Sequence, residues 1–158
     1  MAYDNSSKTC GSISPEDLAA VLKFLTVEER EELCNYLEYR EYPANSVFIQ
    51  EGETGGFMGF LVSGRLEIKK ATDFAGKYVV VAILERGAMV GEMAVTGPRV
   101  RAATAHVKED SRLLILTSSR MEALTDENPR LGIKLLKRIL YVLGCRLSGA
   151  DERLSWLL

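Results

Sequence analysis

Two residues of opposite charge, Glu92 and Arg101, flank a short break at Gly97-Pro98, and Gly91 stands directly before the acid. A glycine lets the backbone approach a ligand closely. A carboxylate accepts hydrogen bonds from sugar hydroxyls, and a guanidinium grips a phosphate with two donors. A short helical turn after Gly91 would add free backbone amides, which favour anions. The segment therefore predicts a pocket for a small anion that carries sugar hydroxyls.

The spacing of these residues resembles the phosphate-binding cassette of the cyclic nucleotide-binding domain family, which includes the cAMP receptor protein and the regulatory subunits of protein kinase A. The resemblance rests on Gly91-Glu92-Met93-Ala94, on Arg101-Ala102-Ala103-Thr104 and on the number of residues between them. Residues 60–64 and 84–87 are similar to the hairpin and the entering strand that precede the cassette. The similarity extends over roughly residues 25 to 148.

Two positions depart from the family pattern. Val90 stands where the family commonly has an aromatic residue, and Gly55-Gly56 stand where it often has a polar or acidic one. Neither departure removes a residue that the resemblance assigns to the phosphate or to the ribose.

The resemblance implies a role for each residue of the cassette. Arg101 would bind the cyclic phosphate, Glu92 the ribose 2′-hydroxyl, and Ala102 would offer a backbone amide beside the phosphate. In this family a threonine at the position of Ala102 can also bond the 2-amino group of guanine, so alanine implies cAMP as the ligand rather than cGMP. The implied ligand-binding residues are Gly91, Glu92, Met93, Ala94, Arg101, Ala102 and Ala103.

Each role has a plainer alternative. Arg101 alone would be a surface salt-bridge residue and Glu92 a solvated helix cap, while Arg99 is a second candidate for the phosphate. Apolar strand residues near the base are more often plain core, and these are Met89, Leu84 and Val81. Two residues lie where the family's final helix closes over the base, and we expect them as candidate lid residues: Arg138 and Tyr141.

Composition restricts the class of protein. With 158 residues, 47% hydrophobic and 27% charged, the chain fits one globular domain. A formal net charge of -2 argues against a nucleic-acid binder. No apolar run is long enough to span a membrane and no signal peptide is evident. The three cysteines, Cys10, Cys34 and Cys145, contain no CxxC pair, which predicts neither a disulfide framework nor a metal site and favours a cytoplasmic location.

Helices are predicted at both ends of the chain. Residues 1–13 are expected to be a flexible tail, and residues 14–158 the domain. Ser14-Pro15 is a helix start with a cap and a proline at the first turn, and Thr26 to Glu29 forms a capping box for a second helix to about residue 37. A short helix over residues 118–127 ends before Pro129. A longer one covers residues 130–147, and Gly149 is expected to end it.

Between these helices, short β-rich runs alternate with turn residues, which is typical of an antiparallel barrel or sandwich. The resemblance makes this an eight-stranded antiparallel β-roll, a jelly-roll with flanking helices. The expected strands cover residues 47–49, 57–62, 66–68, 78–84, 104–107 and 113–116. Breaks are expected at residues 62–64 and 108–110.

The last long helix carries two adjacent apolar stripes, which predicts two packing partners. One stripe would cover the barrel, and the other would meet a second copy or a partner protein. The first contains Leu135, Ile139 and Val142, and the second Leu136, Leu140, Leu143 and Leu147. A fully buried core helix is the alternative. Trp156 and the leucines near it would extend the contact or cap the pocket.

The resulting hypothesis is a sensor that binds cAMP, or less favourably cGMP, and transmits binding through its last helix. One alternative keeps the fold as a protein-interaction module without nucleotide. The other, an enzyme of the related cupin barrel, needs clustered histidines, and His106 is the only one. We therefore expect no enzyme activity, no metal and no cofactor.

Overall fold

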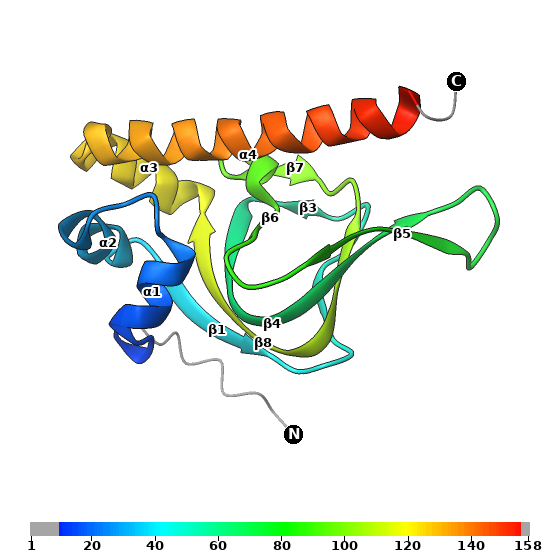
Figure 1. Ribbon diagram of the computed structural model, residues 1–158, viewed down its shortest axis with the longest axis horizontal. Helices are drawn as coiled ribbons and strands as arrows, with labels where there is room; N and C mark the ends of the chain where they lie inside the picture. The colour runs from blue at the N-terminus through cyan, green and yellow to red at the C-terminus, as the bar shows by residue number, and fades with distance from the viewer. Residues whose placement is uncertain (1–9, 156–158) are drawn as a thin grey trace.

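The computed structural model describes the backbone of residues 10–155 and the side chains of residues 10–150. A β-roll forms the centre, with α1 and α2 at one end and α4 across the top (Figure 1). The strands are β1 (Glu38–Tyr42), β2 (Val47–Ile49), β3 (Thr54–Gly55), β4 (Phe57–Ala71), β5 (Tyr78–Leu84), β6 (Met89–Val90), β7 (Arg99–Val100) and β8 (Thr104–Thr117). The helices are η1 (Cys10–Ser12), α1 (Pro15–Val21), α2 (Val27–Cys34), η2 (Glu92–Ala94), α3 (Ser118–Glu127) and α4 (Pro129–Ser155).

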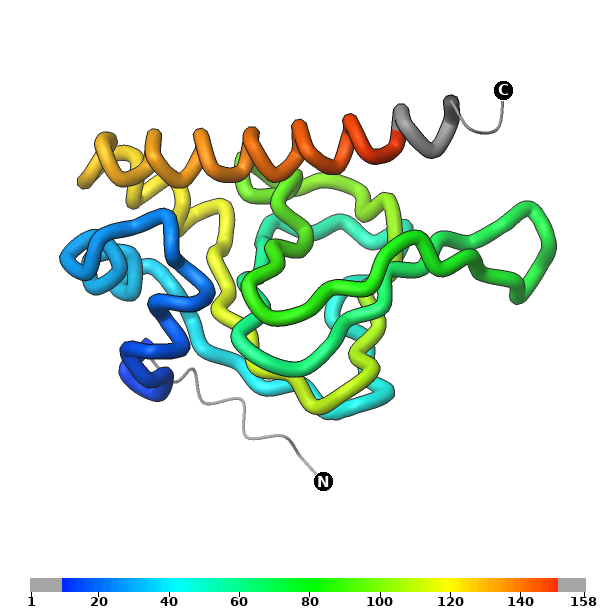
Figure 2. The backbone as a smooth tube through the Cα atoms, viewed as in Figure 1, coloured from blue at the N-terminus to red at the C-terminus, as the bar shows by residue number. Residues whose placement is uncertain are grey.

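All of the strand pairs are antiparallel. One sheet has the order β1-β8-β4-β5, with β2 also paired to β8 and β6 to β4, and a small second sheet pairs β3 with β7. The described residues thus contain the eight strands and flanking helices that were expected. The hairpin of β4 and β5 extends beyond the body of the roll (Figure 2).

Two long strands replace four of the short ones that the sequence predicted. The breaks expected at residues 62–64 and 108–110 are wrong, because β4 and β8 pass through them and stay paired. The turn residues cause shifts of register between Leu61 and Leu66 instead of ending the strands. Gly64 makes this possible, since its backbone is left-handed with φ +94°.

Alternation along β8 divides the apolar core into two parts. Leu114 and Leu116 belong to the cluster shared with the helices, whereas Leu113 and Ile115 belong to the cluster inside the roll. Neighbouring residues of a strand point to opposite faces of its sheet, so one strand serves both clusters. The helices therefore pack against one face of β8, and the interior of the roll lies against the other face.

The starts of the first two helices follow local capping chemistry. Ser14 accepts from the amide of Asp17, and Thr26 and Glu29 complete a reciprocal capping box. Glu29 also accepts from Lys134 Nζ at 2.7 Å, and this hydrogen bond lowers the pKa of Glu29. The cap of α2 is thereby tied to α4.

Helix α4 is longer than predicted. It continues through Gly149 to Ser155 instead of ending at the glycine. Leu135 and Ile139 are buried, while Leu140 and Leu147 are 70% and 66% exposed. The two apolar stripes therefore differ, as expected: one packs on the core and most of the other faces outward, although Leu143 packs partly on the core. Trp156 lies outside the described residues.

The N-terminal prediction needs two corrections. Residues 10–13 are not tail, because Cys10–Ser12 form η1 and both Cys10 and Ile13 are buried. Cys10 and Cys34 form a disulfide, although the cysteine spacing predicted none. The pairing joins η1 to the end of α2, a contact between distant residues that spacing alone does not reveal. Cys145 is free and exposed on α4.

None of the helices described is long and apolar enough to cross a membrane.

Candidate functional site

The cassette begins with a left-handed glycine after β6. Gly91 has φ +73°, and it leads into the turn η2, where Glu92 is only 5% exposed. A Cβ at Gly91 would lie 2.8 Å from Ile49 Cδ1 and 2.9 Å from Arg101 Nη1. Both the backbone conformation and the space therefore require glycine. The glycine thus lets the backbone come close to the guanidinium of Arg101.

Arg101 is buried at the centre of the site, 8% exposed. Its Nη2 donates to the carbonyl of Phe57 at 2.7 Å and its Nη1 to the carbonyl of Gly91 at 3.2 Å. The guanidinium carbon lies 4.6 Å from the centre of the Phe57 ring. Burial lowers the pKa of Arg101, and the nearby charge of Glu92 opposes this effect. The cation is thus held without a direct ion pair to a described acid.

The position of Arg101 explains why residue 55 is a glycine. A Cβ there would lie 2.7 Å from Arg101 Nε and 2.8 Å from Nη2. The departure from the family pattern at Gly55 therefore leaves room for the guanidinium. A side chain at Gly56 would instead approach Ser118 Oγ, at 2.9 Å.

The backbone around Arg101 is fixed by the loop between β2 and β3. The amide of Arg101 donates to the carbonyl of Glu53 at 2.8 Å, and its own carbonyl accepts from Gly52 at 2.9 Å. Thr104 Oγ1 accepts from the amide of Glu51 at 3.0 Å. These bonds fix the backbone from which the arginine side chain extends.

A cavity of about 740 Å³ opens beside Arg101 and Glu92. All seven of the predicted ligand-binding residues line it: Gly91, Glu92, Met93, Ala94, Arg101, Ala102 and Ala103. Arg99, the second candidate for the phosphate, also lines it, from β7. Most of the other lining residues are apolar, so the cavity combines a few charged groups with a largely apolar wall.

The three apolar residues that were weighed as contacts of the nucleotide base occupy different environments in the structure. Leu84 and Val81 line the cavity, and Val81 is 41% exposed. The plain-core alternative is therefore wrong for Val81. Met89 belongs to the main core and is buried. Strand β5 forms an edge of the sheet, where an apolar residue need not be covered.

The candidate lid residues do not line the cavity. The guanidinium of Arg138 packs over the rings of Phe24 and Tyr141 instead. Arg146, about two turns further along α4, lines the cavity in their place. It donates to Glu92 Oε1, and through Nη2 to the carbonyl of Met89 at 2.6 Å. Sequence reasoning missed this residue, since it stands among several basic residues of one helix.

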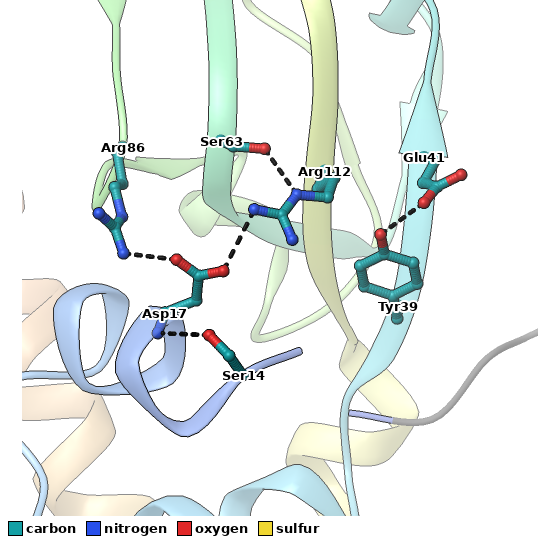
Figure 3. A network of polar contacts seen from close by, with 7 residues as sticks. All are labelled: Ser14, Asp17, Tyr39, Glu41, Ser63, Arg86 and Arg112. Atoms are coloured by element: carbon teal, nitrogen blue, oxygen red, sulfur yellow. Dashed lines mark hydrogen bonds and ion pairs between the residues drawn. The ribbon is translucent and has the colours of Figure 1, made fainter. Parts of the chain in front are cut away.

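The N-terminal helix is anchored close to the strand that enters the cassette. Asp17 of α1 lies between Arg86 and Arg112 and accepts from both, at 2.5 and 3.2 Å (Figure 3). Arg112 of β8 also donates to Ser63 at 2.8 Å. Arg86 belongs to the turn between β5 and β6. One carboxylate therefore connects the first helix, β8 and the turn that leads to Met89.

Among the described residues, no group of three or more potential ligands is placed to hold a metal ion.

Comparison with known proteins decides the family. The model of the cyclic nucleotide-binding domain matches residues 39–128, which is more than half of the chain. The chain belongs to the cyclic nucleotide-binding domain family. The match contains the whole cassette and ends just before α4, so Arg146 lies outside it.

Among curated relatives, a cAMP-dependent protein kinase regulatory subunit from Mycosarcoma maydis is 36% identical over 98 residues, covering 60% of this chain and 18% of the relative. The cyclic AMP receptor protein of Thermus thermophilus is 29% identical over 133 residues, covering 84% of this chain and 59% of the relative. The chain thus spans less than two thirds of these relatives.

Solved structures agree on the fold. A cyclic nucleotide-binding domain from Methylobacillus flagellatus has a TM-score of 0.80 and 22% identity, covering 88% of this chain and 83% of that one. Thermus thermophilus catabolite activator protein has a TM-score of 0.71 and 28% identity, covering 91% and 63%. The regulatory subunit of a cAMP-independent protein kinase A from Trypanosoma brucei has a TM-score of 0.64 and 21% identity, covering 78% and 44%.

Proposed function

We propose that this domain binds a 3′,5′-cyclic nucleotide, with cAMP preferred over cGMP, and acts as a regulatory module. The observation that carries the proposal is a buried arginine and a buried glutamate in a largely apolar cavity, the arginine having no ion pair to a described acid. A buried cation without an anionic partner is costly, and an anionic ligand would supply that partner. A cyclic nucleotide supplies an anionic phosphate, ribose hydroxyls and a flat apolar base.

Each part of such a ligand has a counterpart in the cavity. The phosphate would take the guanidinium of Arg101 and the amide of Ala102, close to the start of η2. The ribose 2′-hydroxyl would donate to Glu92. The base would lie along the apolar wall that includes Val81 and Leu84. The family is one of ligand-binding domains, and we expect neither catalysis nor a cofactor.

The direct test is calorimetric titration with cAMP, with cGMP and with 5′-AMP as a control. Saturable binding of a cyclic nucleotide, with 5′-AMP much weaker, supports the proposal. The alternative function is a protein-interaction module without nucleotide. The Trypanosoma brucei regulatory subunit belongs to a kinase described as cAMP-independent, so the fold alone does not establish a response to cAMP. Absence of binding by all three nucleotides would favour that alternative. A cytoplasmic location stays a prediction.

Ligand choice is expected to depend on Ala102. With alanine at position 102, the 2-amino group of guanine has no threonine hydroxyl to bond. One missing hydrogen bond costs about 0.5–1.5 kcal/mol. We therefore expect cAMP to bind a few-fold to about tenfold more tightly than cGMP. Ala102→Thr should reduce or reverse this ratio in a competition assay. A parent that prefers cGMP, or a ratio that stays unchanged, would assign selectivity to other residues.

The outward stripe of α4 is expected to support a two-fold homodimer, in which like faces meet. Leu140 is the better site for a disrupting charge than Leu143, because Leu140 is 70% exposed and Leu143 packs partly on the core. Light scattering should show a dimeric parent and a monomeric Leu140→Glu variant of unchanged circular dichroism. A parent that is monomeric at about 50 µM, a concentration that populates even moderate interfaces, would contradict the dimer.

A further inference from the structure

A disulfide joins the first described turn, η1, to the end of α2. Its cysteines, Cys10 and Cys34, have a sequence separation of 24, and their Cα atoms lie 5.4 Å apart. This Cα distance is in the usual range for a disulfide. The loop that the bond closes contains the whole of α1. Opening the bond would therefore change what holds the first part of the domain together.

Residues 10–13 depend on this bond for their attachment to the body. The amide of Ile13 donates to the carbonyl of Cys10 at 3.0 Å, and this hydrogen bond holds the turn together without joining it to another element. Gly11 and Ser12 are exposed, while the side chains of Cys10 and Ile13 are buried in the main core. Ordering four residues costs more free energy than the burial of these two side chains recovers. The disulfide therefore supplies a necessary part of the attachment.

Helix α1 is attached in a different way. Leu22, at its end, is fully buried in the core. The carboxylate of Asp17 accepts from Arg86 and Arg112, which belong to the roll (Figure 3). None of these contacts involves η1 or the disulfide. We therefore expect α1 to keep its place when the disulfide opens.

The two cysteines differ in how easily a small thiol reaches them. Cys10 is 3% exposed, whereas Cys34 is partly exposed and is the last residue of α2. The thiolate of a small thiol therefore attacks the sulfur of Cys34, and Cys10 leaves as a thiolate. A second small thiol then displaces Cys34 from the mixed disulfide. Cys10 and Cys34 take up the two protons that the small thiols release, and the two small thiols end as one disulfide.

We propose that the bond between Cys10 and Cys34 is a redox-controlled latch for residues 10–13. The oxidised latch holds this turn on the core, and reduction by small thiols releases the turn while α1 stays in place. The reduced domain then carries a free thiol at the end of α2. Reduction also lowers stability, because a cross-link that closes a loop of this length restricts the unfolded chain. The inference does not depend on nucleotide binding.

The test compares the air-oxidised chain with and without an excess of reduced glutathione. Maleimide labelling in denaturant, read by mass spectrometry, should count one reactive thiol, Cys145, before reduction and all three cysteines after it. The melting temperature should fall by about 5–10 °C on reduction. Cys34→Ser should melt like the reduced parent and should not respond to glutathione. The matched control Cys145→Ser should keep the full response of the parent.

Hydrogen exchange measured by NMR locates the released segment. On reduction, the amide of Ile13 should lose its protection, while the amide of Leu22, which donates to the carbonyl of Leu18 at 2.8 Å, should keep it. Three reactive thiols in the air-oxidised chain would overturn the bond itself. An Ile13 amide that stays protected after reduction would overturn the latch. Loss of protection at Leu22 as well would also overturn it, since α1 would then open together with the turn.

Discussion

Replacing Arg101 with leucine is expected to abolish nucleotide binding almost completely. Its buried guanidinium lines the cavity and donates to the carbonyl of Gly91, the residue that precedes η2. Removing one partner of a buried charge pair costs roughly 2–5 kcal/mol, which corresponds to about thirty- to several-thousand-fold in affinity. Titration calorimetry with cAMP measures the loss, and circular dichroism shows whether the fold is kept.

Arg99→Leu is the matched control for this prediction. Arg99 lines the same cavity but lies on the exposed strand β7, so we expect at most a few-fold loss. Glu92→Ala should have an effect between the two, because it removes a hydroxyl acceptor rather than the phosphate partner. If Arg101→Leu binds as well as the parent while Arg99→Leu does not, the phosphate arginine is Arg99.

Gly64→Ala is expected to cause the largest loss of stability. A Cβ at this position would lie 2.2 Å from Ser111 Oγ and 2.6 Å from the carbonyl oxygen of Asp110, and the φ of +94° is unfavourable for alanine. Backbone strain costs about 1–3 kcal/mol and overpacking about as much again. Their sum is a large part of the 5–15 kcal/mol that typically stabilises a domain. Chemical denaturation measures the difference.

Gly76→Ala is the control that separates backbone strain from the close contact. Gly76 has a similar φ of +75°, but no atom lies within 4 Å of its Cβ position. Its substitution therefore measures the cost of the backbone conformation alone, about 1 kcal/mol. Equal losses for the two variants would show that the contact with β8 is accommodated, contrary to our expectation.

The sequence predicted those parts of the fold that depend on neighbouring residues. Ser14 and Thr26 start helices because their side chains bond amides three residues ahead, and the structure contains both bonds. Turn residues were less informative. At Gly64, and at residues 108–110, the chain stays in a strand because pairing between β4 and β8 outweighs local preference.

In the candidate site, too, the sequence located the residues that lie close together along the chain and missed the one that lies far from them. Gly91, Glu92 and Arg101 could be located because they lie within one short segment with a recognisable spacing, and the structure brings them to one cavity. Arg146 reaches that cavity from 54 residues beyond Glu92. Its position depends on the phase of α4 and on how the helix lies over the roll, neither of which the local sequence determines. Arg138 and Tyr141 lie on the same helix but do not line the cavity, and Arg138 packs over the rings of Phe24 and Tyr141 instead.

The length of α4 gives it a mechanical property. The helix has 27 residues, about 40 Å, and its last buried core residue, Ile139, lies well before its end. From Ile139 to Ser155 the rigid rod extends about 24 Å, so a tilt of about ten degrees at the buried part displaces the far end by about 4 Å. If α4 tilts as a rigid rod, it would act as a lever that turns a sub-ångström adjustment near its buried part into a displacement of its far end comparable to the width of a side chain.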